Sequence, residues 1–200
     1  MVRDRHDRWN HNTHYYDIVL SAVPPAAQTA LDVGTGDGLL AARLRSEIPE
    51  VTGIDSDTEV IGRARNDPAE VNWMIGDVMT TPLPQGHYDL VASVATVHHL
   101  PDLAAGLARL ADLTAPGGAL VVIGCARNSS PSDYALDVIG AVQHQFYSRT
   151  RGYWQHSAPV VVEFPHTYDQ VRQIAVSTLP GMQWRRLPLW RYAITWTKPR

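Results

Sequence analysis

Short apolar runs separated by amphipathic stretches make up most of the first 124 residues of this 200-residue chain. An apolar run of four to eight residues bounded by turn signals predicts a buried strand, and apolar residues spaced three or four apart predict a helix. Helices are predicted after the first, second and fourth strands, which is typical of βαβ units. The predicted strands cover residues 30–33, 51–55, 71–75, 87–94 and 119–124.

The remainder of the chain breaks this alternation. Residues 125–167 contain one helical pattern, over 134–147, followed by irregular sequence rich in aromatic residues and histidine. A second helix is predicted over 168–179, and two alternating strands, 182–187 and 191–197, predict a C-terminal hairpin. The apolar positions of the first of these helices are Leu136, Ile139, Val142 and Phe146.

Composition and charge narrow the class of protein. Two hundred residues suit one domain, and 17 basic against 20 acidic residues give a net charge of −3. This balance argues against a broad surface for nucleic acid or membranes. The single Cys125 excludes an internal disulfide, the charged N-terminus is unlike a signal peptide, and no apolar run approaches the ~18 residues of a membrane span. We expect one cytoplasmic domain, as a monomer or homodimer.

The first strand leads into a glycine loop and then a helix. Gly34, Gly36 and Gly38 follow the strand, and helical spacing begins at Leu39. Such a loop directs backbone N–H groups at a helix N-terminus toward a polar ligand, and glycine permits positive φ and close approach. The third glycine of the dinucleotide pattern G-x-G-x-x-G would stand at position 39, where this chain has leucine. The loop therefore departs from the NAD-binding pattern.

Residues 31–38, in which Asp32 stands just before the first glycine, resemble motif I of the class I S-adenosylmethionine (SAM)-dependent methyltransferases. The resemblance covers residues 28–124, including the sequence Tyr-Asp-Leu-Val at 88–91, and extends to the C-terminal hairpin. It implies an α/β, Rossmann-like, doubly wound fold whose seven-stranded sheet is parallel except for an antiparallel last strand. It also implies SAM as the cofactor and S-adenosylhomocysteine (SAH) as its product.

The resemblance places the cofactor at the carboxyl ends of the strands. Asp55 lies seventeen residues after Gly38, near the roughly 20 expected of a ribose-binding acid. Asp57 competes for this role, but it looks more like the N-cap of the next helix. Asp77 and Val78 match the adenine site, although a lone Gly-Asp pair is commonly only a turn. The predicted cofactor residues are Asp32, Gly34, Thr35, Gly36, Gly38, Asp55, Ser56, Asp77, Val78, Ser93 and Val94.

Two adjacent histidines follow the fourth strand. His98 and His99 would lie at the carboxyl end of the sheet, where ligands bind in such folds, and a His-His-Leu run there resembles small-molecule methyltransferases. One of them is a candidate general base or substrate contact; alternatively, both are polar residues beside the cofactor. No metal is expected, because adjacent histidines on a helical turn point apart and no further ligand is suitably spaced.

Two segments could cover this site. Residues 9–23 have the spacing of an amphipathic helix that ends at Pro24 and Pro25. This helix could pack on the core or form a lid, with Tyr15 as the second candidate base. Residues 125–167 stand where the family commonly inserts a substrate cap; alternatively, they are a packing excursion. The candidate substrate contacts among them are Tyr147, Trp154 and His156.

We therefore expect one domain, residues 1–200, that transfers a methyl group from SAM to an O, N or C nucleophile of a small-molecule metabolite. Holding the nucleophile in line with the sulfonium carbon can supply roughly 7–11 kcal/mol. The motif of adenine and glutamine methylation, Asn or Asp followed by Pro-Pro and an aromatic residue, is absent from the sequence after the fourth strand. The alternatives are a peptide or protein methyltransferase, a SAM-binding protein without methyl transfer, and a dinucleotide oxidoreductase.

Overall fold

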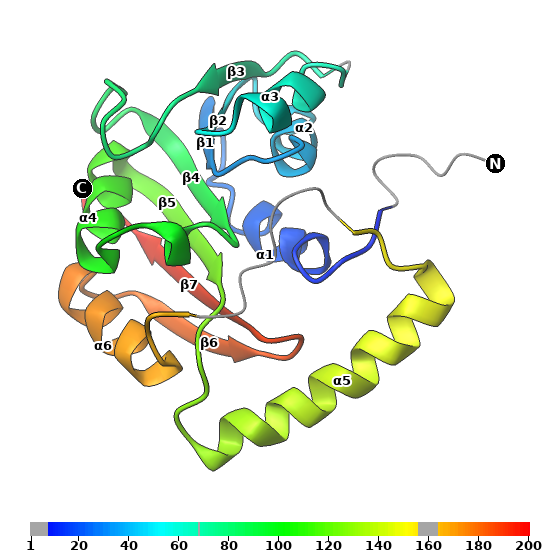
Figure 1. Cartoon of the computed structure of the whole chain (residues 1–200). Coiled ribbons are helices and arrows are strands. Elements are labelled where there is room, and N and C mark those ends of the chain that lie inside the picture. Colours follow the sequence, from blue (N-terminus) through cyan, green and yellow to red (C-terminus); the bar gives the residue numbers. More distant parts are fainter. Residues whose placement is uncertain (1–7, 68, 156–163) are drawn as a thin grey trace.

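A seven-stranded sheet forms the centre of the computed structural model, which describes residues 8–67, 69–155 and 164–200 (Figure 1). The strand order is β3-β2-β1-β4-β5-β7-β6. Neighbouring strands from β3 through β5 are parallel, and β7 is antiparallel to both β5 and β6. The expected Rossmann-like α/β fold with an antiparallel last strand is confirmed. The strands are β1 (Thr29–Val33), β2 (Glu50–Asp55), β3 (Asn72–Ile75), β4 (Tyr88–Val94), β5 (Thr114–Gly124), β6 (Gln183–Leu187) and β7 (Arg191–Thr197).

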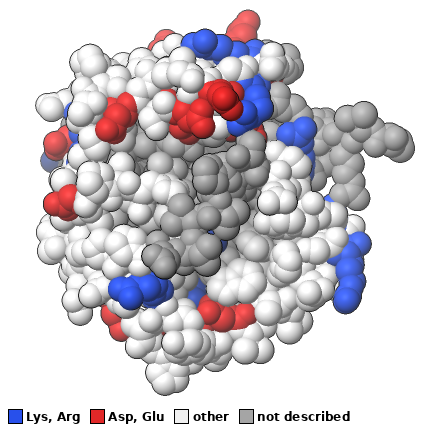
Figure 2. Space-filling model, viewed as in Figure 1, with Lys and Arg blue, Asp and Glu red and all other residues white. Residues whose placement is uncertain are grey.

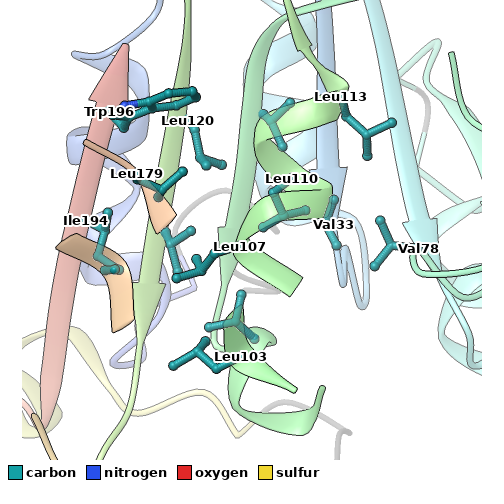
Figure 3. Packing of buried hydrophobic residues seen from close by; sticks show 14 of the residues in the cluster. Val33, Val78, Leu103, Leu107, Leu110, Leu113, Leu120, Leu179, Ile194 and Trp196 are labelled. Carbon is teal, nitrogen blue, oxygen red and sulfur yellow. The ribbon is translucent and has the colours of Figure 1, made fainter. Parts of the chain in front are cut away.

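Helices cover both faces of this sheet (Figure 1). Residues of α4 and α6 share one hydrophobic cluster with the sheet, and residues of α1 and α2 share the other. In Figure 3 the leucines at 103, 107, 110 and 113 project from α4 at helical spacing toward the sheet. The helices are α1 (Tyr16–Leu20), α2 (Leu39–Arg45), α3 (Thr58–Ala64), α4 (Leu103–Leu113), α5 (Pro131–Arg151) and α6 (Tyr168–Thr178), with 3-10 turns η2 (Thr13–Tyr15) and η3 (Val97–His99). Within the described residues, none of these helices has the length and apolar character needed to cross a membrane.

The N-terminal helix is much shorter than residues 9–23. The Asn10 side chain accepts hydrogen bonds from the backbone N–H groups of Asn12 and Thr13, both at 2.9 Å. These bonds hold the start of the segment in a turn, because an asparagine side chain competes with the helical hydrogen-bond pattern. Helical structure therefore begins only at Thr13 and ends at Leu20.

Helix α5 extends beyond the predicted 134–147 at both ends. Ser130 and Asp133 form a capping box that starts it, with Pro131 at the first helical position. Three of the apolar residues that predicted the helix face solvent: Ile139, Val142 and Phe146 are 48%, 66% and 60% exposed. The helix is confirmed, but its apolar spacing does not mark a side packed on the core. It runs along the edge of the molecule, beside the β6–β7 turn and not across a face of the sheet (Figure 1).

Candidate active site

A cavity of about 1170 Å³ opens at the carboxyl ends of the five parallel strands, β1 to β5. Ligands bind at this edge in doubly wound α/β proteins. The volume exceeds the roughly 300–1,000 Å³ of most ligand pockets, so the cavity has room for a cofactor and a small acceptor together. The strand ends and the loops after them contribute residues 32–37, 54–57, 76–78, 94–96 and 125–128.

The three glycines of the loop after β1 all have positive φ, between 54° and 80°. A Cβ added at Gly34 would lie 2.0 Å from Thr96 Oγ1, and one added at Gly38 would lie 2.4 Å from Trp73 Cη2. A Cβ added at Gly36 would meet nothing within 4 Å. Gly34 and Gly36 line the cavity, whereas Gly38 lies outside the lining, where it caps α2 and makes room for the indole ring. The structure therefore gives Gly38 a packing role and does not bring it to the cavity lining.

The two carboxylates after β2 have different partners. Asp55 Oδ2 accepts a hydrogen bond from Gly36 N at 2.9 Å, which ties the end of β2 to the glycine loop. A carboxylate oxygen has a second lone pair, so Asp55 retains capacity to bind hydroxyl groups. Asp57 accepts from the backbone N–H groups of Glu59 and Val60 and caps α3, as predicted. Ser56 and both carboxylates line the cavity.

Asp32 lies buried at the cavity wall, with only 2% of its surface exposed. Its Oδ2 accepts a hydrogen bond from Thr35 Oγ1 at 2.6 Å. Burial raises the pKa of Asp32 to about 7; the hydrogen bond from Thr35 acts in the opposite direction, and the nearby charge of Asp55 adds to the rise. The carboxyl group of Asp32 therefore changes its charge near neutral pH.

Of the remaining predicted cofactor residues, all but one line the cavity, and the exception lies in β4. Asp77, Val78 and Val94 line the cavity, but Ser93 does not. Ser93 is fully buried and donates a hydrogen bond to Val33 O at 3.2 Å, between the paired strands β4 and β1. Successive side chains of a strand point to opposite faces, so the step from Ser93 to Val94 decides which one meets the cavity. Asp77 Oδ1 also accepts a hydrogen bond from Met79 N at 2.9 Å, which closes a turn. The same side chain therefore stabilises the turn and lines the cavity.

The turn η3 places both predicted histidines at the cavity. The Nδ1 atom of His98 is buried and has no hydrogen-bond partner within the described part of the chain. Burial lowers the pKa of His98 to about 4, and the positive charges of His99 and Arg191 lower it further. The ring is therefore neutral at neutral pH. Among the described residues, no three His, Cys, Asp or Glu side chains are grouped to hold a metal ion.

Tyr15, the second candidate base, does not line the cavity. Its hydroxyl group donates a hydrogen bond to Pro188 O at 2.7 Å, and burial raises its pKa to about 12. The next residue, Tyr16, lines the cavity instead. One residue along a helix turns the side chain by about 100°, so the side chain of Tyr16 meets the cavity and that of Tyr15 does not.

Aromatic and histidine side chains from segments outside the strand ends, here called the aromatic cover, also line the cavity. Trp154, a candidate substrate contact, is among them, and its backbone N–H donates to Trp9 O at 2.8 Å. Tyr147 lies outside the lining and packs against the rings of Trp9 and His14, with centroids 5.3 and 5.0 Å away. The third candidate, His156, lies outside the described residues. The cover is lined by His11, Tyr134, Tyr153, Trp154, Phe164 and Trp190.

Several lining residues were not predicted from the sequence. His11 and Tyr16 belong to a segment dense in histidine and tyrosine, which is a signal that could have found them. Trp190 lies in the turn between β6 and β7, where Leu189 and Trp190 both have positive φ, at 53° and 58°. The sequence does not predict positive φ at these two positions, because residues other than glycine adopt it infrequently.

Comparison with known proteins identifies the family. A family model described as a methyltransferase domain matches residues 31–122. An uncharacterized methyltransferase of Mycobacterium tuberculosis is 39% identical over 193 residues, which cover 96% of this chain and 98% of that protein. The chain belongs to the class I SAM-dependent methyltransferases. A ubiquinone biosynthesis O-methyltransferase of Xanthomonas axonopodis pv. citri is 32% identical to this methyltransferase over 130 residues, covering 62% of the chain and 54% of that protein.

Solved structures share the fold at low sequence identity. Phosphoethanolamine N-methyltransferase 2 of Haemonchus contortus, in complex with SAM, matches with a TM-score of 0.65 and 16% identity over 94% of this chain. The match spans only 53% of that longer chain. The [4+2]-cyclase SpnF matches with a TM-score of 0.67 and 15% identity, over 99% of this chain and 86% of its own. These likenesses show the fold of this methyltransferase.

The residues around the glycine loop fit the SAM cofactor of the family. The open space beside Gly36 permits the close approach of a ligand to the loop backbone. Asp55 supplies acceptor oxygens of the kind that ribose hydroxyl groups require. Asp32 supplies a carboxyl group that is ionised above neutral pH, which favours a positively charged ligand.

Proposed function

We propose that this methyltransferase acts on an oxygen, nitrogen or carbon nucleophile of a small-molecule metabolite. The aromatic cover supports this proposal, because Asn10, Trp154 and Trp190 come from three distant segments and line the same cavity as the strand ends. A peptide or protein substrate would need an open surface at that place. On the face shown in Figure 2, the Lys and Arg side chains of the described residues are dispersed among uncharged surface, unlike a nucleic-acid-binding stripe.

Each wall of the cavity has its own role in this proposal. Asp55 would bind the ribose hydroxyl groups, and Asp77 with Val78 would bind the adenine. The N-terminal segment, residues 9–23, would act as the lid, and residues 125–167 as the substrate cap. When bound, SAM supplies an electrophilic methyl group on a positively charged sulfur. The aromatic cover would exclude water and hold the acceptor in line with that group, which converts binding energy into orientation.

His98 is proposed to accept the proton of a hydroxyl or amine acceptor. Its neutral ring is ready to receive a proton, and the partly exposed ring lines the cavity. The proton on the acceptor becomes strongly acidic as the new bond to carbon forms, so a base with a pKa of about 4 can take it late in the reaction. Removing the proton beforehand would need a stronger base. His99, which is exposed at the cavity, would contact the substrate.

A screen of small acceptors with SAH formation as the readout tests the function. Phenols, hydroxy acids and amines are offered together with peptides, and binding of SAM, SAH and NADH is titrated in parallel. We expect SAH to form with a small acceptor and NADH not to bind. Turnover of peptides alone would favour the protein methyltransferase. SAH binding without any turnover would favour a different reaction, since one protein of this fold is named a [4+2]-cyclase.

Replacing His98 by asparagine is expected to lower turnover of that acceptor about 100-fold, at the low end of general-base effects, because its pKa is far from neutral. The affinity for SAH should stay within about twofold of the wild-type value. Steady-state kinetics and calorimetric titration measure the two quantities. His99→Asn is the matched control and should lose less activity. Equal losses in the two variants would contradict the assignment of the proton to His98.

A further inference from the structure

Helix α5 turns its apolar side toward solvent. The outward positions Tyr134, Val138, Val142 and Phe146, here called the outer stripe, are 60–66% exposed, and Ile139 beside them is 48% exposed. A surface helix normally buries its apolar side and exposes its polar side. The opposite, inward side of α5 carries polar residues among apolar ones: Asp133, Asp137, Gln143, His144 and Ser148 lie there with Leu136 and Tyr147. A contiguous exposed apolar surface of this kind marks an interaction site.

The inward side of α5 is fixed to the rest of the molecule. Arg186 of β6 forms ion pairs with Asp133 at 3.2 Å and with Asp137 at 3.0 Å. At the middle of the helix, a Cβ on Gly140 would lie 2.7 Å from Leu189 N, so the helix approaches the β6–β7 turn as closely as a glycine allows. The helix cannot rotate to bury the outer stripe without breaking these contacts. Any cover for the stripe must therefore come from outside.

The outer stripe is symmetric about position 140. Val138 and Val142 lie two residues to either side of it, and Tyr134 and Phe146 lie six residues to either side. If two copies of α5 cross antiparallel on a two-fold axis, position 138 faces 142 of the other copy and 134 faces 146. Residues four apart form the ridge whose packing gives the commonest helix crossing, at about −50°. A two-fold interface requires such self-complementarity.

We propose that α5 is a homodimer interface in which the outer stripes of two copies pack antiparallel. An aromatic side chain offers about 150–250 Å², so the five exposed side chains present roughly 500 Å² in each copy. The pair would bury roughly 1,000 Å², at the lower end of specific interfaces. The stripe carries no charged residue that would repel the second copy. Because Tyr134 and Asp137 also line the cavity, the dimer would hold in place a helix that borders the active site.

Sedimentation velocity of the full chain over roughly 1–100 µM tests the dimer, since an interface of this size gives a reversible association. We expect the dimer fraction to rise with concentration and Val142→Glu to remain monomeric throughout. Val176→Glu is the matched control, because Val176 is a valine of α6 that is 57% exposed outside the stripe. It should dimerise as the wild type does. At the lowest concentrations, where the wild type is also monomeric, thermal unfolding and SAH affinity should be the same in all three proteins.

A mixture of two variants tests the antiparallel register. Val138→Lys and Val142→Glu should each be monomeric alone, and an equimolar mixture should form a heterodimer in which the lysine faces the glutamate. A parallel arrangement would align position 138 with 138 and give no such pairing. The proposal would be overturned by a wild-type protein that stays monomeric, by a dimer that survives Val142→Glu, or by a mixture that does not associate. Binding of a monomeric wild type to phosphatidylcholine vesicles, lost in Val142→Glu, would assign the stripe to a membrane surface instead.

Discussion

Replacing Asp55 by alanine is expected to weaken the binding of SAM and SAH about 10- to 150-fold. A charge-assisted hydrogen bond contributes roughly 1.5–3 kcal/mol, which corresponds to that range in affinity. The substitution also removes the acceptor for Gly36 N, a 2.9 Å bond that positions the glycine loop. Calorimetric titration with SAH measures the loss without requiring a methyl acceptor.

Two further variants separate ligand binding from folding in this experiment. Asp57→Ala removes the N-cap of α3, so it should lower the free energy of unfolding by about 1 kcal/mol with little change in SAH affinity. Asp55→Asn keeps an acceptor for Gly36 N but loses the charge, and its affinity should be intermediate. Urea unfolding of each variant checks that the protein is folded. An unchanged SAH affinity in Asp55→Ala would refute the ribose assignment.

The sheet and the cofactor end of the cavity could be predicted because they depend on local patterns. Each of the first five strands is an apolar run bounded by turn residues, and parallel strands bring their carboxyl ends to one edge. Asp32, Asp55 and Asp77 stand at or directly after strand ends, so their place followed from the strands that carry them.

The other predicted site residues depended on orientation and on distant contacts. Ser93 and Tyr15 are each one residue from a lining residue, and a single step reverses the side of a strand or rotates a helix by about 100°. Gly38 is needed because Trp73, from a strand far along the sequence, packs against it. The outward side of α5 could not be predicted either, since apolar spacing shows that a helix has an apolar side but not what that side contacts.

A second large effect is expected on stability: Asp32→Asn should raise the free energy of unfolding above pH 7 by up to about 4 kcal/mol. Burial raises the pKa of Asp32 in the folded protein to about 7, against 3.8 as the ordinary value. Between these two pH values the folded state holds a proton that the unfolded state has released, so stability falls as pH rises through the window. A shift of about three units at 1.36 kcal/mol each gives the limit of roughly 4 kcal/mol.

The comparison between variant and wild type should therefore depend on pH. Asparagine is neutral at every pH and keeps an acceptor for the Thr35 hydroxyl group, which bonds to Asp32 at 2.6 Å. The two proteins should be similar in stability near pH 4 and differ most above pH 7. Urea unfolding from pH 5 to pH 8 measures the difference, and Asp112→Asn, at an exposed carboxylate of α4, controls for the loss of one charge. A difference that does not change with pH would contradict the raised pKa.

The same substitution should reveal why a costly buried carboxyl group stands at the cavity. SAM carries a positive sulfur that SAH lacks, so ionised Asp32 should favour SAM over SAH, and this preference should grow as pH rises through about 7 in the wild type. In Asp32→Asn the preference for SAM over SAH should be weaker, and it should not change with pH through the ionisation of residue 32. Calorimetric titration of both ligands at pH 6 and pH 8 tests it. A more stable variant with a weaker preference for SAM would mean that Asp32 is retained for the cofactor at the expense of the fold. If the wild type and Asp32→Asn prefer SAM over SAH equally, the carboxylate of Asp32 lowers the stability of the fold without contributing to cofactor selection.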